Sequence, residues 1–261
     1  MQLTSMTVQT VFQNLLVAAL PGDELEYLLA HLEPVTLNSE DSIYVQDDPI
    51  NYIYFPLDCI VSSLAIMSDG ATVEIGMLGR ESIVGVSAIL GEYRARNWIR
   101  VLVPGRALRL RSEMARELLR RNAFTERLLM RAYRAIVTQI SQRAVCNGRH
   151  VMLRRLATWL LLVHDRAGAD VIPLTHETIS GRLGSRRASV TQAACYLQNV
   201  QAISYSRGKI HIDNRAAIEA EACECYEVMR KEFDSLKIWG GQNSEHSRSR
   251  LSIPTRIRDV Q

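Results

Sequence analysis

Arginine, hydroxyl and amide side chains gather in one stretch of the sequence and suit contact with a polyanion. From Arg182 to Leu197 the chain carries three arginines and no acidic residue. Arg186 and Arg187 lie only a few residues before Gln192. A guanidinium can donate two hydrogen bonds to the edge of guanine, and a glutamine amide suits adenine. The chemistry available here is recognition of bases and phosphates, and it requires a helix that presents these groups outward.

The surrounding residues predict two short helices joined by a tight turn, the arrangement of a helix-turn-helix. Thr175 can cap the first helix, and Gly184 tolerates the left-handed conformation of a tight turn. Ser185 is a candidate cap for the second helix, to within one residue. Both helices have apolar residues at helical spacing, namely Ile179, Leu183, Val190, Ala193, Ala194 and Leu197. Taken alone, this stretch fits a DNA major groove and an ordinary pair of surface helices about equally.

The residues that follow favour the DNA-binding interpretation. The run Ile203-Ser-Tyr-Ser-Arg-Gly-Lys-Ile-His-Ile212 predicts two short strands that turn at Arg207-Gly208. A helix-turn-helix followed by such a hairpin is a winged helix. Arg207 and Lys209 at the tip of the wing suit phosphate contacts.

The composition of the whole chain is that of an ordinary globular protein, with 47% hydrophobic and 23% charged residues. Its 261 residues can hold two modest domains or one large one. The net charge of +3 is too small to argue for nucleic acid by itself. No apolar run reaches the ~18 residues of a membrane span, and the N-terminus lacks a signal-peptide pattern. We therefore expect a cytoplasmic protein with no membrane partner.

The five cysteines form no Cys-x-x-Cys pair and no spacing typical of disulfides, which favours a reducing compartment. Placed on one helix, Cys223 and Cys225 direct their thiols to roughly opposite faces, so neither a shared metal ion nor a bridge is favoured. No Ser-His-Asp set, metal-ligand spacing or phosphate-binding Gly-x-x-x-x-Gly-Lys motif can be placed. We predict no metal site, no cofactor and no enzymatic activity.

Short β-rich runs separated by turn residues dominate residues 33–111, after two short helices expected at 8–19 and 21–32. The runs are Val35–Leu37, Ser42–Gln46, Tyr52–Phe55, Ile60–Met67, Thr72–Met77, Trp98–Val103 and Ala107–Leu110. Many short strands at this spacing are typical of a small all-β barrel or roll.

After the roll the pattern becomes helical, with helices expected at 112–121, 123–147, 149–164 and 214–233. The long helix at 123–147 carries an apolar stripe, made of Phe124, Leu128, Ala132, Ala135, Ile136, Ile140 and Ala144. The stripe can pair with a copy of itself in a two-fold dimer or pack only on the roll. We favour pairing, because two-fold DNA sites demand two readers. Asn147-Gly148 marks a break and a hinge.

These patterns divide the chain into a β-roll domain at 8–121, a dimerisation helix at 122–147 and a winged helix-turn-helix domain at 148–235. The tail at 236–261 is rich in Gly, Ser and Arg with little apolar content, and we predict that it is disordered.

The order of roll, long helix and winged helix, over about residues 16–226, resembles the Crp/Fnr family of bacterial transcription regulators. The strongest match is Ile172-Pro-Leu-Thr-His-Glu-Thr-Ile-Ser-Gly-Arg-Leu-Gly-Ser-Arg-Arg-Ala-Ser-Val-Thr191. In the roll, residues 76–85 resemble the family's glycine-flanked turn and residues 98–110 its last strands. The resemblance implies an α+β fold. It comprises an N-terminal double-stranded β-helix (jelly-roll-like) effector domain, a long dimerisation helix and a C-terminal winged helix-turn-helix.

The resemblance places a candidate effector pocket at Gly85, Val86, Arg94 and Arg96, with departures from the cyclic AMP-binding pattern. Relatives that bind cyclic AMP carry a glutamate for the ribose where this chain has Val86, and an Arg-Ser or Arg-Thr pair for the phosphate. Here the run is Arg94-Ala-Arg-Asn97. A ribose hydroxyl left unpaired costs about 1–3 kcal/mol, so we predict weak or no cyclic AMP binding. Iron–sulfur relatives carry an N-terminal cysteine cluster, whereas the first cysteine here is Cys59.

The resemblance also implies which side chains meet DNA. Base contacts fall on Arg187, Ala188, Thr191 and Gln192. Phosphate contacts fall on Thr175, His176, Ser185, Arg186, Ser189, Arg207 and Lys209. A dimer would present its two recognition helices about 34–36 Å apart, one turn of DNA.

The function that these features imply is a sequence-specific transcription regulator that binds a palindromic double-stranded DNA site as a homodimer, without control by cyclic AMP. RNA polymerase and an unknown small-molecule effector are the further partners that the resemblance suggests. The alternative is a sensory or scaffold protein that has lost specific DNA binding. The cationic second helix counts against that alternative.

Overall fold

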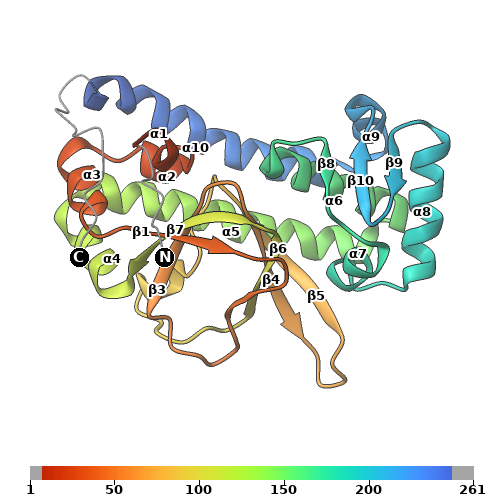
Figure 1. The fold of residues 1–261 in the computed structure, drawn as a ribbon, viewed down its shortest axis with the longest axis horizontal. Coiled ribbons are helices and arrows are strands. Elements are labelled where there is room, and N and C mark those ends of the chain that lie inside the picture. The colour runs from red at the N-terminus through yellow and green to blue at the C-terminus, as the bar shows by residue number, and fades with distance from the viewer. Residues whose placement is uncertain (1–7, 249–261) are drawn as a thin grey trace.

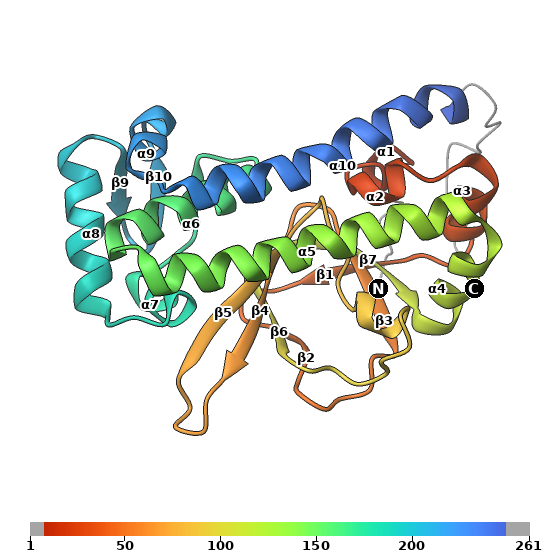
Figure 2. The ribbon, with the colours of Figure 1, turned by 180° about the vertical axis from the view of Figure 1, so that it is seen from behind.

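The computed structural model describes residues 8–248 of the chain. A β-roll with short helices lies at one end of the molecule, and a small helical unit with its own sheet lies at the other (Figure 1). Two long helices, α5 (Ala123–Arg149) and α10 (Glu224–Arg248), run side by side along the molecule and connect its ends (Figure 2). The predicted order of roll, long helix and winged helix-turn-helix is confirmed.

The roll consists of antiparallel strands in two sheets, and all seven predicted runs form strands. One sheet has the order β1-β7-β3, with β1 (Glu33–Leu37), β7 (Gly105–Arg111) and β3 (Tyr52–Pro56). The other has the order β2-β6-β4-β5, with β2 (Ser42–Tyr44), β6 (Trp98–Val103), β4 (Ile60–Ile66) and β5 (Thr72–Leu78). Inward-facing residues form a shared apolar core that includes Leu37, Val61, Leu78, Val101 and Ala107.

Short helices cover one end of the roll: α1 (Val8–Val11), α2 (Leu15–Ala18), α3 (Gly22–Leu29) and α4 (Ser112–Arg121). The single helix predicted at 8–19 is wrong, because Asn14 interrupts it. The Asn14 side-chain oxygen accepts hydrogen bonds from the backbone N–H groups of Leu16 (3.1 Å) and Val17 (3.2 Å). Its amide donates to the carbonyls of Pro56 and Ser82, both at 3.0 Å. This buried asparagine therefore both caps α2 and fastens it to the roll.

Helix α5 uses part of the predicted apolar stripe inside its own chain. Leu128 and Ala132 belong to the core between the roll and the short helices. Ala135 packs instead against Phe233 and Leu236 of α10. The stripe is thus shared between the roll and α10, and Leu128, Ala132 and Ala135 pack within their own chain rather than against a second copy. A neighbouring row of large apolar residues, which shares Ile140 with the predicted stripe, stays exposed on this helix.

The C-terminal unit begins with α6 (Met152–Ala167) and contains the elements expected of a winged helix. They are β8 (Val171–Ile172), α7 (His176–Leu183), α8 (Arg187–Asn199), β9 (Ile203–Ser206), β10 (Lys209–Ile212) and α9 (Arg215–Glu221). Strands β8, β10 and β9 form a three-stranded sheet in that order. Its core includes Leu160, Ile179, Val190, Leu197 and Ile210.

Two boundaries differ from the prediction. Helix α5 continues through Asn147-Gly148 to Arg149, and the chain leaves helical geometry only at His150, where φ is −103° and ψ is 144°. The helix predicted at 214–233 is two helices, since Ala222 and Cys223 separate α9 from α10.

The last helix is also longer than predicted. Helix α10 continues to Arg248, so residues 236–248 of the predicted tail are part of a helix. Phe233 and Leu236 pack against α5, and this packing gives the extended helix a partner that its sequence does not reveal. Residues 249–261 of the predicted tail lie outside the described residues. Between residues 8 and 248, none of the helices combines the length and apolarity that crossing a bilayer requires.

Candidate nucleic-acid interface

The turn between α7 and α8 forms as its residues predict, with one shift. The Thr175 hydroxyl accepts a hydrogen bond from the Thr178 backbone N–H at 3.0 Å and so caps α7. Gly184 adopts the left-handed conformation, with φ 56° and ψ 47°. The N-cap of α8 is Arg186 rather than Ser185, because the Ser185 N–H bonds back to the Ser180 carbonyl at 3.0 Å and closes α7. Ser185 is therefore part of the turn.

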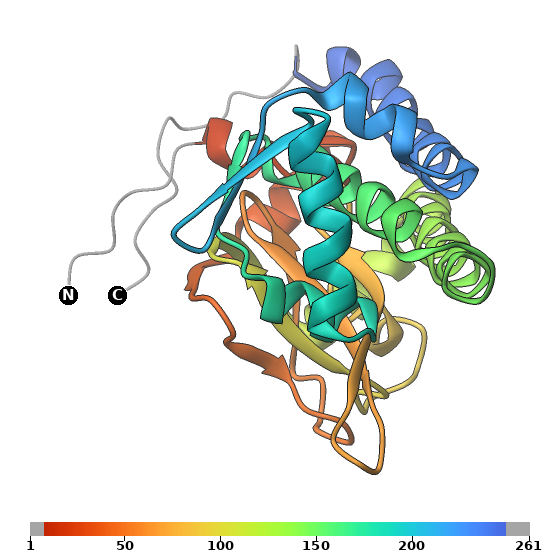
Figure 3. The ribbon, with the colours of Figure 1, turned by 90° about the vertical axis from the view of Figure 1, so that its right-hand side faces the viewer.

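Apolar packing decides which face of α8 is exposed. Val190, Ala194 and Leu197 are at most 1% exposed and pack in the core of the C-terminal unit. The opposite face carries Arg187 and Gln192, both of which are exposed. Figure 3 shows α8 standing on the outside of the C-terminal unit. Polar and cationic groups thus project from α8 away from the core. Of the other residues predicted to meet DNA from this region, Arg186 and Ala188 are exposed, and Ser185, Ser189 and Thr191 are partly buried.

Arg187 is only weakly held by other residues of the chain. Its side chain is 69% exposed, and its one ion pair is a long contact of 3.9 Å from Nη1 to the Glu177 carboxylate. An exposed ion pair of that length contributes little to the free energy of folding. The guanidinium can therefore leave Glu177 for another acceptor with little loss of stability.

His176 and Thr191 contact each other within the C-terminal unit. The Nδ1 atom of His176 shares a hydrogen bond of 3.1 Å with the Thr191 hydroxyl. The imidazole also stacks on the Tyr205 ring, with 4.5 Å between centroids. Burial, and then the charge of Arg187, lower the pKa of His176 below its ordinary value. His176 therefore joins α7, α8 and the wing as a largely neutral, partly buried ring, and its phosphate contact stays a prediction.

The wing is a two-residue hairpin. Ser206 pairs with Lys209 across β9 and β10, and the turn residues Arg207 and Gly208 have φ values of 48° and 77°. Two positive φ values are those of a type I′ turn, which suits the twist of paired strands. Arg207 and Lys209 are both exposed at the tip.

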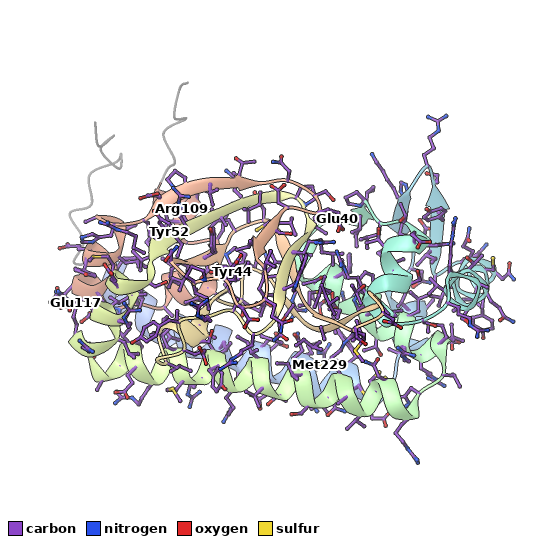
Figure 4. All side chains as sticks on the ribbon, turned by 90° about the horizontal axis from the view of Figure 1, so that it is seen from below. Glu40, Tyr44, Tyr52, Arg109, Glu117 and Met229 are labelled. Carbon is purple, nitrogen blue, oxygen red and sulfur yellow. The ribbon has the colours of Figure 1, made fainter. Side chains whose placement is uncertain are left out.

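One side of α7 contacts the roll, whereas α8 lies at the far end of the C-terminal unit, away from the roll (Figure 1). The guanidinium of Arg182 is nearly buried and bonds the Glu40 carboxylate at 2.9 Å. Figure 4 places Glu40 at the edge of the roll nearest the C-terminal unit. A Cβ atom on Gly184 would lie 3.0 Å from the Val73 side chain, so the turn packs closely on β5. Arg182, one of the three arginines of the cationic stretch, thus anchors the unit instead of facing outward.

The candidate effector pocket is occupied by the protein's own side chains. Gly85 has a φ of 84°, and a Cβ there would lie 2.6 Å from the Tyr44 hydroxyl. That hydroxyl donates to the carbonyl of Tyr52 (Figure 4). Val86 is buried in an apolar cluster at the start of the short 3₁₀ helix Val86–Ala88.

Arg94 and Arg96 do not enter the roll. Both side chains are exposed, and each bonds within its own surface region. Arg94 donates to the carbonyl of Asp47 at 2.6 Å, and Arg96 pairs with Glu92 at 2.7 Å. Of the four residues predicted for the pocket, Val86 is therefore buried, Gly85 is partly buried, and Arg94 and Arg96 are exposed.

Sequence reasoning missed one cluster. The Sγ atoms of Cys146, Cys223 and Cys225 all lie within 4.8 Å of one another, and all three residues are buried. The prediction that the Cys223 and Cys225 thiols point to opposite faces of one helix is wrong, because Cys223 precedes α10 and is not helical. No local signal joins Cys146 to residues almost eighty positions later.

A roll of this topology joined to a winged helix-turn-helix defines a class of protein, the DNA-binding regulators that carry a sensory roll. Known protein families match both parts of the chain. Residues 34–122 match the cyclic nucleotide-binding domain, and residues 154–221 match the Crp-like helix-turn-helix domain. The chain belongs to the Crp/Fnr family and is a transcription regulator of that type.

Its relatives are distant. The chain is 21% identical over 195 residues to the global nitrogen regulator of Synechocystis sp., covering 71% of this chain and 87% of that protein. It is 24% identical over 186 residues to the global nitrogen regulator of Nostoc sp., covering 68% and 83%.

Solved structures share the fold. FixK2 from Bradyrhizobium japonicum superposes with a TM-score of 0.64 at 18% identity, covering 74% of this chain and 98% of that one. A CRP-family transcriptional regulator from Thermus thermophilus gives a TM-score of 0.61 at 16% identity, covering 72% and 95%.

Proposed function

We propose that this regulator binds a two-fold symmetric DNA site as a homodimer and that cyclic AMP is not its effector. The observation that carries the proposal is the outward face of α8, where Arg187 and Gln192 are exposed on a helix whose other face is buried. A helix of this kind on a winged fold can enter the major groove.

Arg187 is the proposed reader of guanine, because its guanidinium is exposed and only weakly paired. Two hydrogen bonds to guanine O6 and N7 discriminate by about 1–3 kcal/mol. Gln192 suits adenine, and exposed Ala188 suits the methyl group of thymine. Thr191 is half-buried and bonded to His176, so its proposed base contact requires that bond to open or to be shared.

Backbone contacts are proposed for the residues around this face. Arg186 at the start of α8 and Arg207 and Lys209 on the wing are exposed cations that can neutralise phosphates. Thr175, Ser185 and Ser189 can donate hydroxyl hydrogen bonds to phosphate oxygens. His176 contributes by holding Thr191 and Tyr205 in place.

A row of exposed apolar residues on α5 supports the homodimer. Met130, Tyr133, Val137 and Ile140 are 46%, 37%, 42% and 38% exposed. Their spacing of three, four and three residues is the a/d pattern of a helix that pairs with another helix. The occupant we propose is the same row on a second copy, since an isologous two-fold contact needs only one self-complementary surface. Each of these large apolar side chains stays more than a third exposed within the described part of the chain.

Independence from cyclic AMP is supported by the filled roll. Tyr44 occupies the space beside Gly85, and Val86 offers no acceptor for a ribose hydroxyl. Arg94 and Arg96 are held at the surface by Asp47 and Glu92. Any effector would have to be of another chemical class. RNA polymerase is the expected further partner of a promoter-bound regulator of this family.

The test is selection of bound sequences from a pool of random duplex DNA with the full chain. We expect enriched sequences with inverted repeats whose half-sites are centred about 10–10.5 base pairs apart, or a multiple of that spacing. A pool with no enriched motif would favour a scaffold protein without specific DNA binding. A single half-site without symmetry would contradict the dimer.

A further inference from the structure

Three cysteines that are distant in sequence converge where α5 ends and α10 begins. Cys146 lies near the end of α5, Cys223 lies in the turn before α10, and Cys225 lies in the first turn of α10. Their sulfur atoms are all within 4.8 Å of one another, and the Cys146 and Cys223 sulfurs are 3.6 Å apart. Exposure of the three residues is 1%, 6% and 0%. The three thiols are free, since a disulfide bond is about 2.05 Å long.

Hydrogen-bond donors are directed at two of the sulfurs. The Gln142 amide donates to Cys225 Sγ at 3.2 Å. The Thr158 hydroxyl oxygen accepts from the Cys223 backbone N–H at 3.2 Å and lies 3.1 Å from Cys223 Sγ. Since the amide already uses the oxygen as an acceptor, the hydroxyl hydrogen can point at the sulfur. Donors around the ligand atoms are typical of thiolates that bind metal ions.

The charges around the cluster also favour anionic sulfur. Cys223 and Cys225 lie at the N-terminal end of the 25-residue helix α10, where the helix dipole is positive. The guanidinium of Arg154 bonds the carbonyl of Ala222, the residue before Cys223, at 3.0 Å. A positive charge thus lies beside the turn that carries the cluster.

We propose that Cys146, Cys223 and Cys225 bind one thiophilic metal ion, and that zinc fits them best. Zinc holds thiolates at about 2.3 Å in tetrahedral geometry, which places two bound sulfurs about 3.8 Å apart. The observed 3.6 Å between Cys146 and Cys223 is already close to that separation. Three soft sulfur ligands select zinc over calcium or magnesium, which take oxygen ligands. Binding would release the three thiol protons to solvent.

His150 is a candidate for the fourth ligand, and its ring would have to move toward the sulfurs, because it lies outside the group of ligand atoms within 4.8 Å of one another. It follows Cys146 by one helical turn, and its backbone N–H bonds the Cys146 carbonyl at 3.1 Å. The ring Nε2 is buried and has no hydrogen-bond partner, and its nearest charged neighbour is the exposed Glu224 carboxylate at 3.6 Å. Neutral imidazole is the usual companion of three thiolates in structural zinc sites.

A metal ion here would join three parts of the fold. The three sulfurs come from α5, from the turn between α9 and α10, and from the first turn of α10. Thr158, which bonds Cys223, belongs to α6. The ion would therefore fix the corner at which the proposed dimer helix passes into the DNA-binding unit. A ligand that binds only the folded state raises its stability.

The test is metal analysis of the full chain, purified under anaerobic and reducing conditions. We expect one zinc ion per chain by inductively coupled plasma mass spectrometry. Removal of zinc by a chelator should lower the thermal midpoint, and added Co²⁺ should give sulfur-to-cobalt charge-transfer bands. Cys146→Ser, Cys223→Ser and Cys225→Ser should each lose the metal. Cys195→Ser is the matched control, since Cys195 is exposed on α8, and it should retain the metal.

Three results would overturn the proposal. They are a reduced wild-type chain that binds neither zinc nor cobalt, a Cys146–Cys223 disulfide in the protein isolated without air, and iron with inorganic sulfide in place of zinc. Where a serine variant fails to fold by circular dichroism, cobalt titration of the wild-type chain decides the question. Metal content is measured without DNA, so it is independent of the proposed DNA-binding function.

Discussion

The indole Nε1 of Trp159 donates a hydrogen bond of 2.8 Å to the Glu74 carboxylate, and this bond joins the C-terminal unit to the roll. Trp159 lies on α6 and Glu74 on β5, and neither is more than 1% exposed. The same carboxylate accepts from the Ser62 hydroxyl at 2.5 Å and lies 3.4 Å from Nη2 of Arg143. A buried charge with these partners is stable only while all of them stay in place. Glu74 therefore links the roll, α5 and α6 in one polar network.

The first prediction concerns the replacement of Glu74. Glu74→Ala leaves the buried guanidinium of Arg143 and the Trp159 N–H without the carboxylate they share. Breaking a buried ion pair from one side costs about 3–5 kcal/mol of folding free energy. Glu74→Gln keeps an acceptor for Trp159 and should cost less. Urea unfolding followed by tryptophan fluorescence measures both changes.

A surface pair serves as the control for Glu74. Glu92→Ala removes a carboxylate whose partner, Arg96, has a side chain 72% exposed, and it should leave the unfolding midpoint near that of the wild type. If Glu74→Ala unfolded at the same midpoint as Glu92→Ala, the network would have no structural role.

The second prediction tests the homodimer with two matched valines on α5. Val137→Asp places a carboxylate in the exposed apolar row, where two-fold pairing would bring it against its own copy. We expect the dissociation constant of the dimer to rise by on the order of tenfold or more, at least about 1.4 kcal/mol. Val145 is also exposed on α5 but lies outside the row, so Val145→Asp should remain dimeric. Sedimentation velocity over a range of protein concentrations distinguishes the two variants. A wild-type chain that sediments as a monomer at all concentrations would contradict the proposal.

Local signals explain how much of this protein could be predicted. The cap at Thr175, the left-handed Gly184 and the apolar spacing of α8 are decided within a few residues of one another, and all three predictions are confirmed. The strands of the roll are likewise local in pattern. Contacts between distant segments decide the rest. Phe233 and Leu236 of α10 pack on Ala135 of α5. The apolar row from Met130 to Ile140 on α5 stays exposed.

The cysteine cluster also depends on contacts between distant segments, which local sequence signals do not predict. Its geometry depends on α10 beginning at Glu224, and helix boundaries are the least reliable part of a sequence interpretation. A shift of a few residues in that boundary changes two thiols on opposite faces into two thiols on one side. His176 is a further example, since its stacking partner Tyr205 comes from a strand almost thirty residues later.

The third prediction separates base reading from phosphate binding with two neighbouring arginines. Arg187→Ala should reduce the preference for the selected DNA site over random DNA by about 1–3 kcal/mol. Arg186→Ala should weaken binding to both DNAs alike. It should also reduce the slope of log affinity against log salt concentration by about one. Fluorescence anisotropy at several salt concentrations measures both effects. Reversed outcomes for the two variants would show that the proposed roles are exchanged.

The fourth prediction concerns the effector. Titration calorimetry of the wild-type chain with cyclic AMP should show no saturable binding, because Tyr44 fills the space at Gly85 and Val86 provides no acceptor. A relative that binds cyclic AMP, run under the same conditions, is the positive control. A low-micromolar dissociation constant would show that the roll opens around the nucleotide.

The last prediction is a pH dependence that arises at His176. Its pKa is lowered by burial and by the nearby Arg187, so the folded chain holds this ring neutral more strongly than the unfolded chain does. Below its ordinary pKa of about 6.5, the unfolded state binds the proton more readily, and stability decreases as the pH falls toward the lower folded value. His176→Gln cannot titrate and should decrease less in thermal midpoint from about pH 7 to about pH 5. At about pH 8 both side chains are neutral, so the difference there reports packing alone and is the internal control. If the difference in thermal midpoint between the wild type and His176→Gln stayed constant at every pH measured, His176 would be excluded as the titrating group.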